Sequence, residues 1–145
     1  GQDITLGDGT SLKADDFRGE ERPATRMVVS GDTSEMAKEV TNLSGVDVLV
    51  HESTFLAESQ QWADEFLHST STGAARTALA CNARHLVLTH FSARLKDAKI
   101  PLSEAKKVLE SSEVSVSAAV DGDRIKISDS GSISHLVWTG DGWSP

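Results

Sequence analysis

The distribution of apolar and polar residues divides the chain near residue 27. The preceding residues are polar, and two short apolar runs flank Gly7-Asp8-Gly9, which predicts a hairpin. The charged stretch that follows contains Pro23 and is interpreted as a loop or linker. We therefore expect an N-terminal hairpin and linker at 1–26 and a second unit at 27–145.

From residue 27 onward, short apolar runs alternate with stretches of helical periodicity. The apolar runs predict strands at 27–29, 46–50 and 85–89, the second of them buried on both faces because it is almost wholly apolar. Helices are expected from Ser34 to about Leu43, from Ser69 or Thr70 to about Cys81, and from about Leu102 to Glu110. This order predicts parallel strands joined by right-handed crossovers.

Two further segments complete the expected architecture. Residues 55–67 are interpreted as irregular or helical, with Phe55, Trp62 and Phe66 packing inward. After the last helix we expect three strands, of which Asp121-Gly122 joins the first two as a hairpin and the third covers 133–138. The C-terminal part is therefore predicted to be a β-meander followed by a tail.

Ionisable side chains follow each of the three apolar runs. Asp32 follows the first run, His51 and Glu52 the second, and His90 the third. Ligands of open α/β sheets bind outside the carboxyl ends of the strands, so these residues should converge, with His68 joining them if its helix packs nearby. Carboxylate and imidazole groups ligate zinc and move protons. This pattern alone leaves a metal or catalytic site and ordinary caps or core histidines equally open.

Four short motifs surround these residues. They are Ser30-Gly31-Asp32-Thr33, His51-Glu52-Ser53-Thr54, His68-Ser69-Thr70 and His90-Phe91-Ser92-Ala93-Arg94. In this order they resemble the Gly-Asp-Thr, His-Glu-Ala-Thr, His-Ser-Thr and His-Phe-Ser-x-Arg-Tyr motifs of ribonuclease Z, a family of tRNA 3′-end-processing endonucleases in the metallo-β-lactamase superfamily. Ser53 and Leu95 stand where the family has Ala and Tyr. The resemblance is good over 28–94, weak before it and general after Pro101.

The resemblance implies an α/β fold in which 27–145 is a half-domain, the C-terminal half of a metallo-β-lactamase αββα sandwich, with a mixed sheet flanked by helices. It implies a zinc-dependent phosphodiesterase that uses a pair of Zn²⁺ ions and cleaves precursor tRNA. Asp32 and His90 would be metal ligands, and Glu52 and His68 would be catalytic residues that transfer a proton. Arg94 would meet a substrate phosphate. Thr54, Ser69 and Thr70 would shape loops and cap a helix.

One signature of the family, His-x-His-x-Asp-His, is absent from the chain. Asp32 and His90 alone fall short of the three or four ligands of a zinc site. We therefore expect an N-terminal half to lie upstream or on another chain, and we expect this chain alone to be inactive and to bind zinc weakly. An apolar sheet face left open would favour a homodimer. The alternatives are another hydrolase of the superfamily, or a non-catalytic half-domain that dimerises or binds a partner.

Composition narrows these expectations. The net charge of −8 argues against a broad nucleic-acid-binding face, so RNA contacts must come from local basic groups, metal ions or the missing part. The single cysteine, Cys81, excludes an internal disulfide and favours a cytoplasmic setting. We expect neither a membrane span nor a signal peptide. His51 remains open between core and site, whereas His85, His135 and the three tryptophans are expected to be structural.

Overall fold

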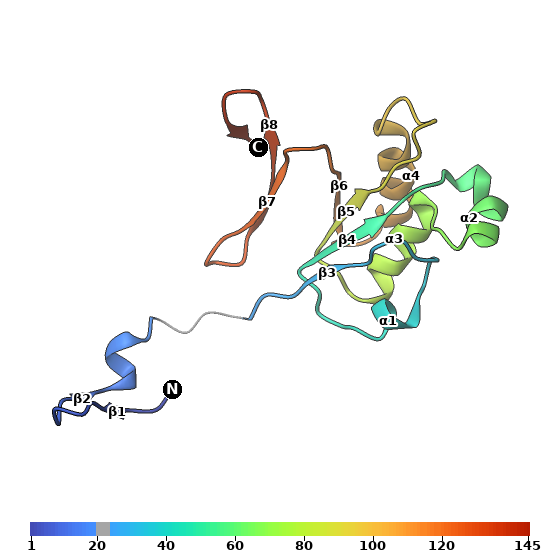
Figure 1. Ribbon diagram of the computed structural model, residues 1–145. Helices are drawn as coiled ribbons and strands as arrows, with labels where there is room; N and C mark the ends of the chain where they lie inside the picture. Colours follow the sequence, from blue (N-terminus) through green and yellow to red (C-terminus); the bar gives the residue numbers. More distant parts are fainter. Residues whose placement is uncertain (20–23) are drawn as a thin grey trace.

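The computed structural model describes residues 1–19 and 24–145. Its centre is a four-stranded sheet in which all neighbouring strands pair in parallel (Figure 1). The strands, in spatial and chain order, are β3 (Met27–Val29), β4 (Val48–Glu52), β5 (His85–Thr89) and β6 (Ser115–Ala118). The segments between them hold α1 (Lys38–Thr41), η2 (Ala57–Ser59), α2 (Gln60–Phe66), α3 (Ser71–Ala80) and α4 (Lys99–Leu109).

The hydrophobic core lies between one face of this sheet and the helices. Strand alternation directs Leu49 of β4 and Leu86 and Leu88 of β5 to the same face, where all three side chains are fully buried. Helix α3 meets them with small alanines, and α4 adds Ala105 and Leu109. Small side chains let a helix pack close to the sheet, so α3 holds its N-terminus firmly near the strand ends.

Two small antiparallel sheets flank this core in sequence. The N-terminal one pairs β1 (Ile4–Thr5) with β2 (Ser11–Leu12) and is followed by the 3-10 helix η1 (Ala14–Phe17). The C-terminal one joins β7 (Arg124–Ile127), β8 (Ile133–Trp138) and β9 (Trp143–Ser144). No helix within residues 1–19 and 24–145 is long and apolar enough to cross a membrane.

The α/β fold with parallel crossovers, flanking helices and C-terminal antiparallel strands is confirmed, but the expected hairpin at Asp121-Gly122 is wrong. The strand before this turn, β6, pairs in parallel with β5, and the strand after it, β7, pairs with β8. The turn is still present, because the Asp123 backbone N–H donates to the Val120 carbonyl at 3.0 Å. It passes the chain from one sheet to another, since β6 completes the edge of the parallel sheet.

Two expectations about the segments between strands are also wrong. The helix expected from Ser34 is only the short α1, because Met36 adopts a left-handed backbone (φ 56°) and its N–H donates to Thr77 Oγ1 of α3 at 2.9 Å. Trp62 and Phe66 do not pack inward: they are 56% and 54% exposed, and α2 buries only Ala63. The linker interpreted before residue 27 contains η1, and Pro23 lies outside the described residues.

His85 on β5 is hydrogen-bonded to the neighbouring strand β6, and it should make the stability of the fold decrease at acidic pH. Its Nδ1 lies 2.7 Å from Ser115 Oγ and its Nε2 lies 2.9 Å from Ser117 Oγ, both on β6. Burial lowers the pKa of His85 below its ordinary value of 6.5, and the nearby His135 lowers it further. The folded protein therefore keeps this imidazole neutral at a pH where the unfolded chain takes up a proton.

We predict that the free energy of unfolding falls as the pH drops below about 6.5, because protonation of His85 then favours the unfolded state. Urea titrations at a series of pH values would measure this slope. His85→Gln should be less stable at neutral pH but should show a shallower slope between about pH 6.5 and pH 5. An unchanged slope in the variant would contradict the assignment to His85.

Candidate metal centre

The residues of the candidate site come from loops at the carboxyl ends of the parallel strands. Asp32 lies shortly after β3, Glu52 is the last residue of β4, and His90 directly follows β5. His68 lies between α2 and α3, two residues before Thr70, whose side chain caps α3 by accepting from the Gly73 N–H. Because the strands run in parallel, these loops share one edge of the sheet.

The structure brings Asp32, His68 and His90 together. One ligand atom from each residue lies within 4.8 Å of the other two. Asp32 Oδ1 is 3.6 Å from His90 Nε2, and the His68 and His90 rings stack with centroids 5.6 Å apart and planes 19° from parallel. Asp32 and His90 are exposed and His68 is partly buried, so the cluster opens to solvent.

Three residues in or directly before this cluster have a left-handed backbone conformation. Gly31, just before Asp32, has φ 60°, Leu67, just before His68, has φ 57°, and His90 itself has φ 53°. Glycine adopts this conformation without steric cost, whereas Leu67 and His90 do so at a cost of about 1–2 kcal/mol each. Such strain persists only where the surrounding structure fixes the chain, and it is concentrated at functional sites.

Glu52 is the acceptor at the centre of the site. Its side chain is only 1% exposed, and its two carboxylate oxygens accept five hydrogen bonds. Oε1 accepts from His68 Nδ1 at 2.9 Å and from the Ser69 and Thr33 backbone N–H groups at 2.8 and 3.2 Å. Oε2 accepts from the backbone N–H and the hydroxyl of Thr54 at 3.0 and 2.8 Å. One carboxylate thus joins three of the four motif loops.

Thr54 extends this network to the fourth loop. Its hydroxyl donates to Glu52 Oε2, so its oxygen is left to accept from His90 Nδ1, which lies 2.9 Å away. The carboxylate of Glu52 cannot donate, so His68 Nδ1 must also carry a hydrogen. Both imidazoles therefore have their Nδ1 engaged, which leaves Nε2 of each ring for a ligand or substrate.

His51 lies on the other face of β4. Alternation along the strand turns it toward the helices, where it is fully buried and its Nδ1 contacts the Glu52 carbonyl at 2.8 Å. Burial lowers the pKa of His51. Its Nε2 has no hydrogen-bond partner among the described residues. The question left open by the sequence is therefore answered: His51 belongs to the core and lies apart from the cluster of Asp32, His68 and His90.

The donor set fits a zinc ion. Zinc takes imidazole nitrogens and carboxylate oxygens, and catalytic sites hold three protein ligands with one position left for water or substrate. Histidine ligands usually donate their second N–H to a carboxylate or another fixed acceptor, which here is Glu52 for His68 and Thr54 for His90. His68 places a third donor atom beside the two expected from the sequence, Asp32 and His90, and this atom can either bind a metal ion or exchange a proton with a substrate.

The sequence interpretation missed the role of Thr54, which was expected only to shape a loop. The signal was available, since a hydroxyl two residues after a carboxylate is suited to a local side-chain hydrogen bond. What the sequence did not indicate is the second contact of Thr54, to His90, which is 36 positions away. Arg94 lies on the surface just beyond His90, beside Thr54.

We predict that Glu52→Ala lowers the free energy of unfolding by about 3 kcal/mol or more. The substitution leaves the part-buried N–H groups of Thr33 and Thr54 and the buried N–H of Ser69 without their acceptor, at about 1–3 kcal/mol for each unsatisfied group. Glu52→Gln keeps one side-chain oxygen and the shape, and should lose markedly less. Chemical denaturation measures both, and equal stability of Glu52→Ala and the wild type would show that this network does not hold the loops.

Known proteins named ribonuclease Z are similar to most of this chain. No family model matches the chain. Ribonuclease Z of Myxococcus xanthus is 47% identical over 94 residues, which cover 65% of this chain and 31% of that protein. Ribonuclease Z of Listeria innocua is 38% identical over 122 residues, covering 83% of this chain and 40% of that protein.

A solved structure supports the fold. The metallo-β-lactamase fold protein YhfI from Bacillus subtilis superposes with a TM-score of 0.57 at 25% identity, covering 75% of this chain and 39% of that one. The chain spans less than half the length of each of these relatives. By sequence and fold together, the chain is homologous to a part of the ribonuclease Z proteins and has the metallo-β-lactamase fold.

Proposed function

We propose that this chain forms part of a zinc-dependent endoribonuclease that removes the 3′ extension of precursor tRNA. The observation that carries the proposal is the convergence of Asp32, His68 and His90 around the buried carboxylate of Glu52. The similarity to ribonuclease Z proteins supports the substrate class. Since the chain covers a part of those proteins, the remaining ligands and much of the RNA-binding surface would come from an N-terminal half.

Asp32 and His90 are the residues that would hold the metal. Both are exposed at the mouth of the site, and Asp32 Oδ1 lies 3.6 Å from His90 Nε2, close enough for both to reach one ion with a small adjustment. A bound zinc pair supplies acidified water and offsets the negative charge that develops on the phosphoryl group. His90 is held for this role through Thr54, whose oxygen accepts from Nδ1.

His68 would act as the proton donor. Nδ1 donates to Glu52, so a second proton taken up by the ring lies on Nε2, from which it can be given away. Attack of water on phosphorus breaks the bond to the 3′ oxygen, and the electron pair stays on that oxygen, which takes the proton from His68 Nε2. The products are a 3′-hydroxyl on the tRNA and a 5′-phosphate on the released trailer. Glu52 touches no reacting atom and positions His68 for the transfer.

The proposal includes further partners. Met27 and Val29 on the edge strand β3 are 51% and 67% exposed, although both are large apolar residues. An N-terminal half or a second copy of the chain would cover this surface, and a cytoplasmic homodimer is the assembly we propose. The alternative is another hydrolase of the same fold. YhfI shares this fold, and its description names no substrate.

We predict that His68→Ala, made in a longer protein that contains this chain and the His-rich signature, slows cleavage of 3′-extended tRNA about 100- to 10,000-fold. Zinc content, measured by elemental analysis, should stay at the wild-type level because Asp32 and His90 remain. Loss of zinc together with activity would show that His68 is a ligand and not the proton donor.

A second prediction concerns Asp32 in the same longer protein. Asp32→Ala should lower the zinc content and abolish cleavage, because the carboxylate is the anionic donor of the cluster. The matched control is Asp97→Ala, at an exposed aspartate in the loop between His90 and α4. This substitution should leave the zinc content and the cleavage rate unchanged. A zinc content equal to the wild type in Asp32→Ala would remove Asp32 from the metal site.

A further inference from the structure

A cavity opens directly beside the candidate metal centre. It has a volume of about 230 Å³ and is lined by residues from the β4–α2 segment and from the loop after His90. Thr54 belongs both to this lining and to the hydrogen-bond network of the site, so the two share a wall. The other lining side chains include Phe55, Leu56, Trp62, Arg94 and Leu95. The lining therefore combines aromatic and aliphatic side chains with the hydroxyl groups of Thr54, Ser59 and Ser92 and a single cationic group.

The tryptophan that lines this cavity, Trp62, is largely exposed and adds little to the hydrophobic core. Trp62 is 56% exposed, and its indole stacks on Phe66 with ring centroids 5.8 Å apart and planes 12° from parallel. Two large aromatic side chains that remain in water on one short helix contribute little to the core. An exposed, fixed indole is a platform on which any nucleobase can stack.

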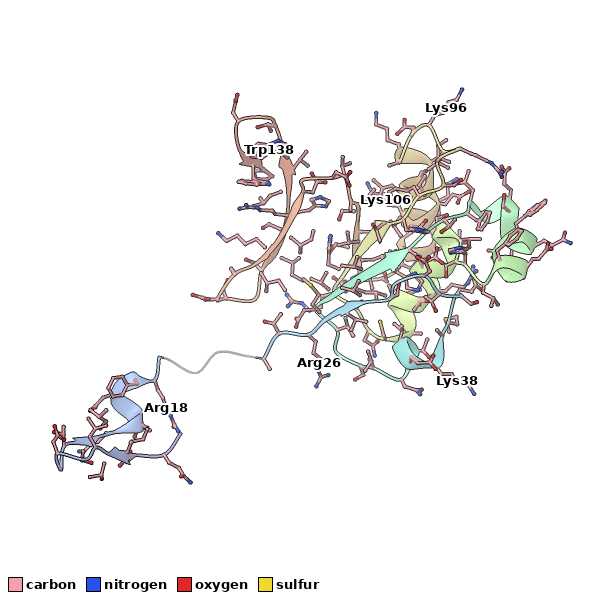
Figure 2. All side chains as sticks on the ribbon, viewed as in Figure 1. Arg18, Arg26, Lys38, Lys96, Lys106 and Trp138 are labelled. Carbon is pink, nitrogen blue, oxygen red and sulfur yellow. The ribbon has the colours of Figure 1, made fainter. Side chains whose placement is uncertain are left out.

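The segment that follows His90, which supplies part of the cavity lining, is rich in basic residues. In a protein with a net charge of −8, the stretch 92–107 carries five basic residues and two acidic ones. The basic residues are Arg94, Lys96, Lys99, Lys106 and Lys107. Figure 2 shows Lys96 extending outward from the loop before α4. Of the acidic residues, Glu104 is occupied, since its carboxylate accepts from the Ala57 N–H and the Ser71 hydroxyl.

Arg94 is the charged group nearest to the cavity. Among the described residues that line it, Arg94 alone carries a formal charge. Within residues 1–19 and 24–145, no ion pair or side-chain hydrogen bond engages its guanidinium group, and only its backbone N–H is bonded, to Ser92 Oγ at 3.3 Å. A free guanidinium beside an exposed indole matches a ligand that combines a flat base with a phosphate.

We propose that this cavity binds one nucleotide of a single-stranded RNA segment, with its base on Trp62 and its phosphate paired with Arg94. The inference rests on the proposed function and adds to it a residue, Trp62, that lies outside the four motifs. Because Thr54 forms the shared wall, the nucleotide held here is next to the bond that is cut. Stacking and a charge pair read no base identity, so the subsite accepts any base.

The test uses the 145-residue chain and a fluorescein-labelled oligouridylate as the probe, in the presence of a chelator, with anisotropy as the readout. Trp62→Ala should weaken binding about tenfold, the usual cost of losing one stacked base, and Trp62→Phe should keep most of the affinity. Trp62 is exposed, so its replacement should not unfold the chain. Trp138→Ala, at a tryptophan of β8 that is 42% exposed and outside the cavity, is the matched control and should bind as the wild type does.

Two further measurements separate the contributions of base and phosphate. Arg94→Gln should weaken binding and reduce its dependence on salt concentration by about one ion. Uridine monophosphate should displace the probe at lower concentration than either uridine or inorganic phosphate. In NMR spectra, the indole N–H signal of Trp62, assigned by its loss in Trp62→Phe, should shift on addition of RNA.

The proposal is overturned if the wild type does not bind the probe, if Trp62→Ala binds as well as the wild type, or if Trp138→Ala loses as much affinity. Binding without metal is independent of cleavage, so the two proposals fail separately. A chain that binds RNA through Trp62, within a longer protein that does not cut tRNA, would refute the nuclease function alone. Normal cleavage with Trp62→Ala and unaltered binding would refute the subsite alone.

Discussion

The site depends on the burial of one carboxylate, that of Glu52. A charged group removed from water is tolerated only where hydrogen bonds replace its hydration, and Glu52 meets this condition with five of them. Three of its donors are backbone N–H groups in separate loops, at Thr33, Thr54 and Ser69. The same contacts that stabilise the charge therefore fix the loops, and the fixed loops place the side chains that perform chemistry.

Two neighbouring residues at the carboxyl end of β4 have different roles, one in the core and one in the site. The neutral, buried His51 faces the helices, while its neighbour Glu52 faces the site, because successive residues of a strand point to opposite faces. Through Thr54, the carboxylate acts on His90 as well as on His68. A single residue of β4 thereby orients both the imidazole proposed to hold the metal and the imidazole proposed to donate a proton. The left-handed conformation of His90 is consistent with a loop held by these contacts.

The sequence predicted the parts of the fold that depend on local pattern. The apolar run at 85–89 became β5 with the expected bounds, and Thr70 became the cap of α3, because burial and capping are local properties. Predictions from the sequence were wrong where tertiary contacts determine the local structure. Ser34 could not start a helix because Met36 turns toward Thr77 of α3, and Trp62 stays exposed although an aromatic residue ordinarily favours the core. The convergence of Asp32 with His90 followed from the parallel order of the strands, whereas the Thr54 contact to His90 required coordinates.

The most direct test of this account is the position of the ring hydrogens on His68 and His90, measured by ¹⁵N NMR of the imidazole nitrogens. If Glu52 holds His68 directly and His90 through Thr54, Nδ1 carries a hydrogen in both rings, and Glu52→Gln disturbs both signals together. A bare Nδ1 with hydrogen only on Nε2, in either ring of the wild-type chain, would contradict the claim that one buried carboxylate organises the centre.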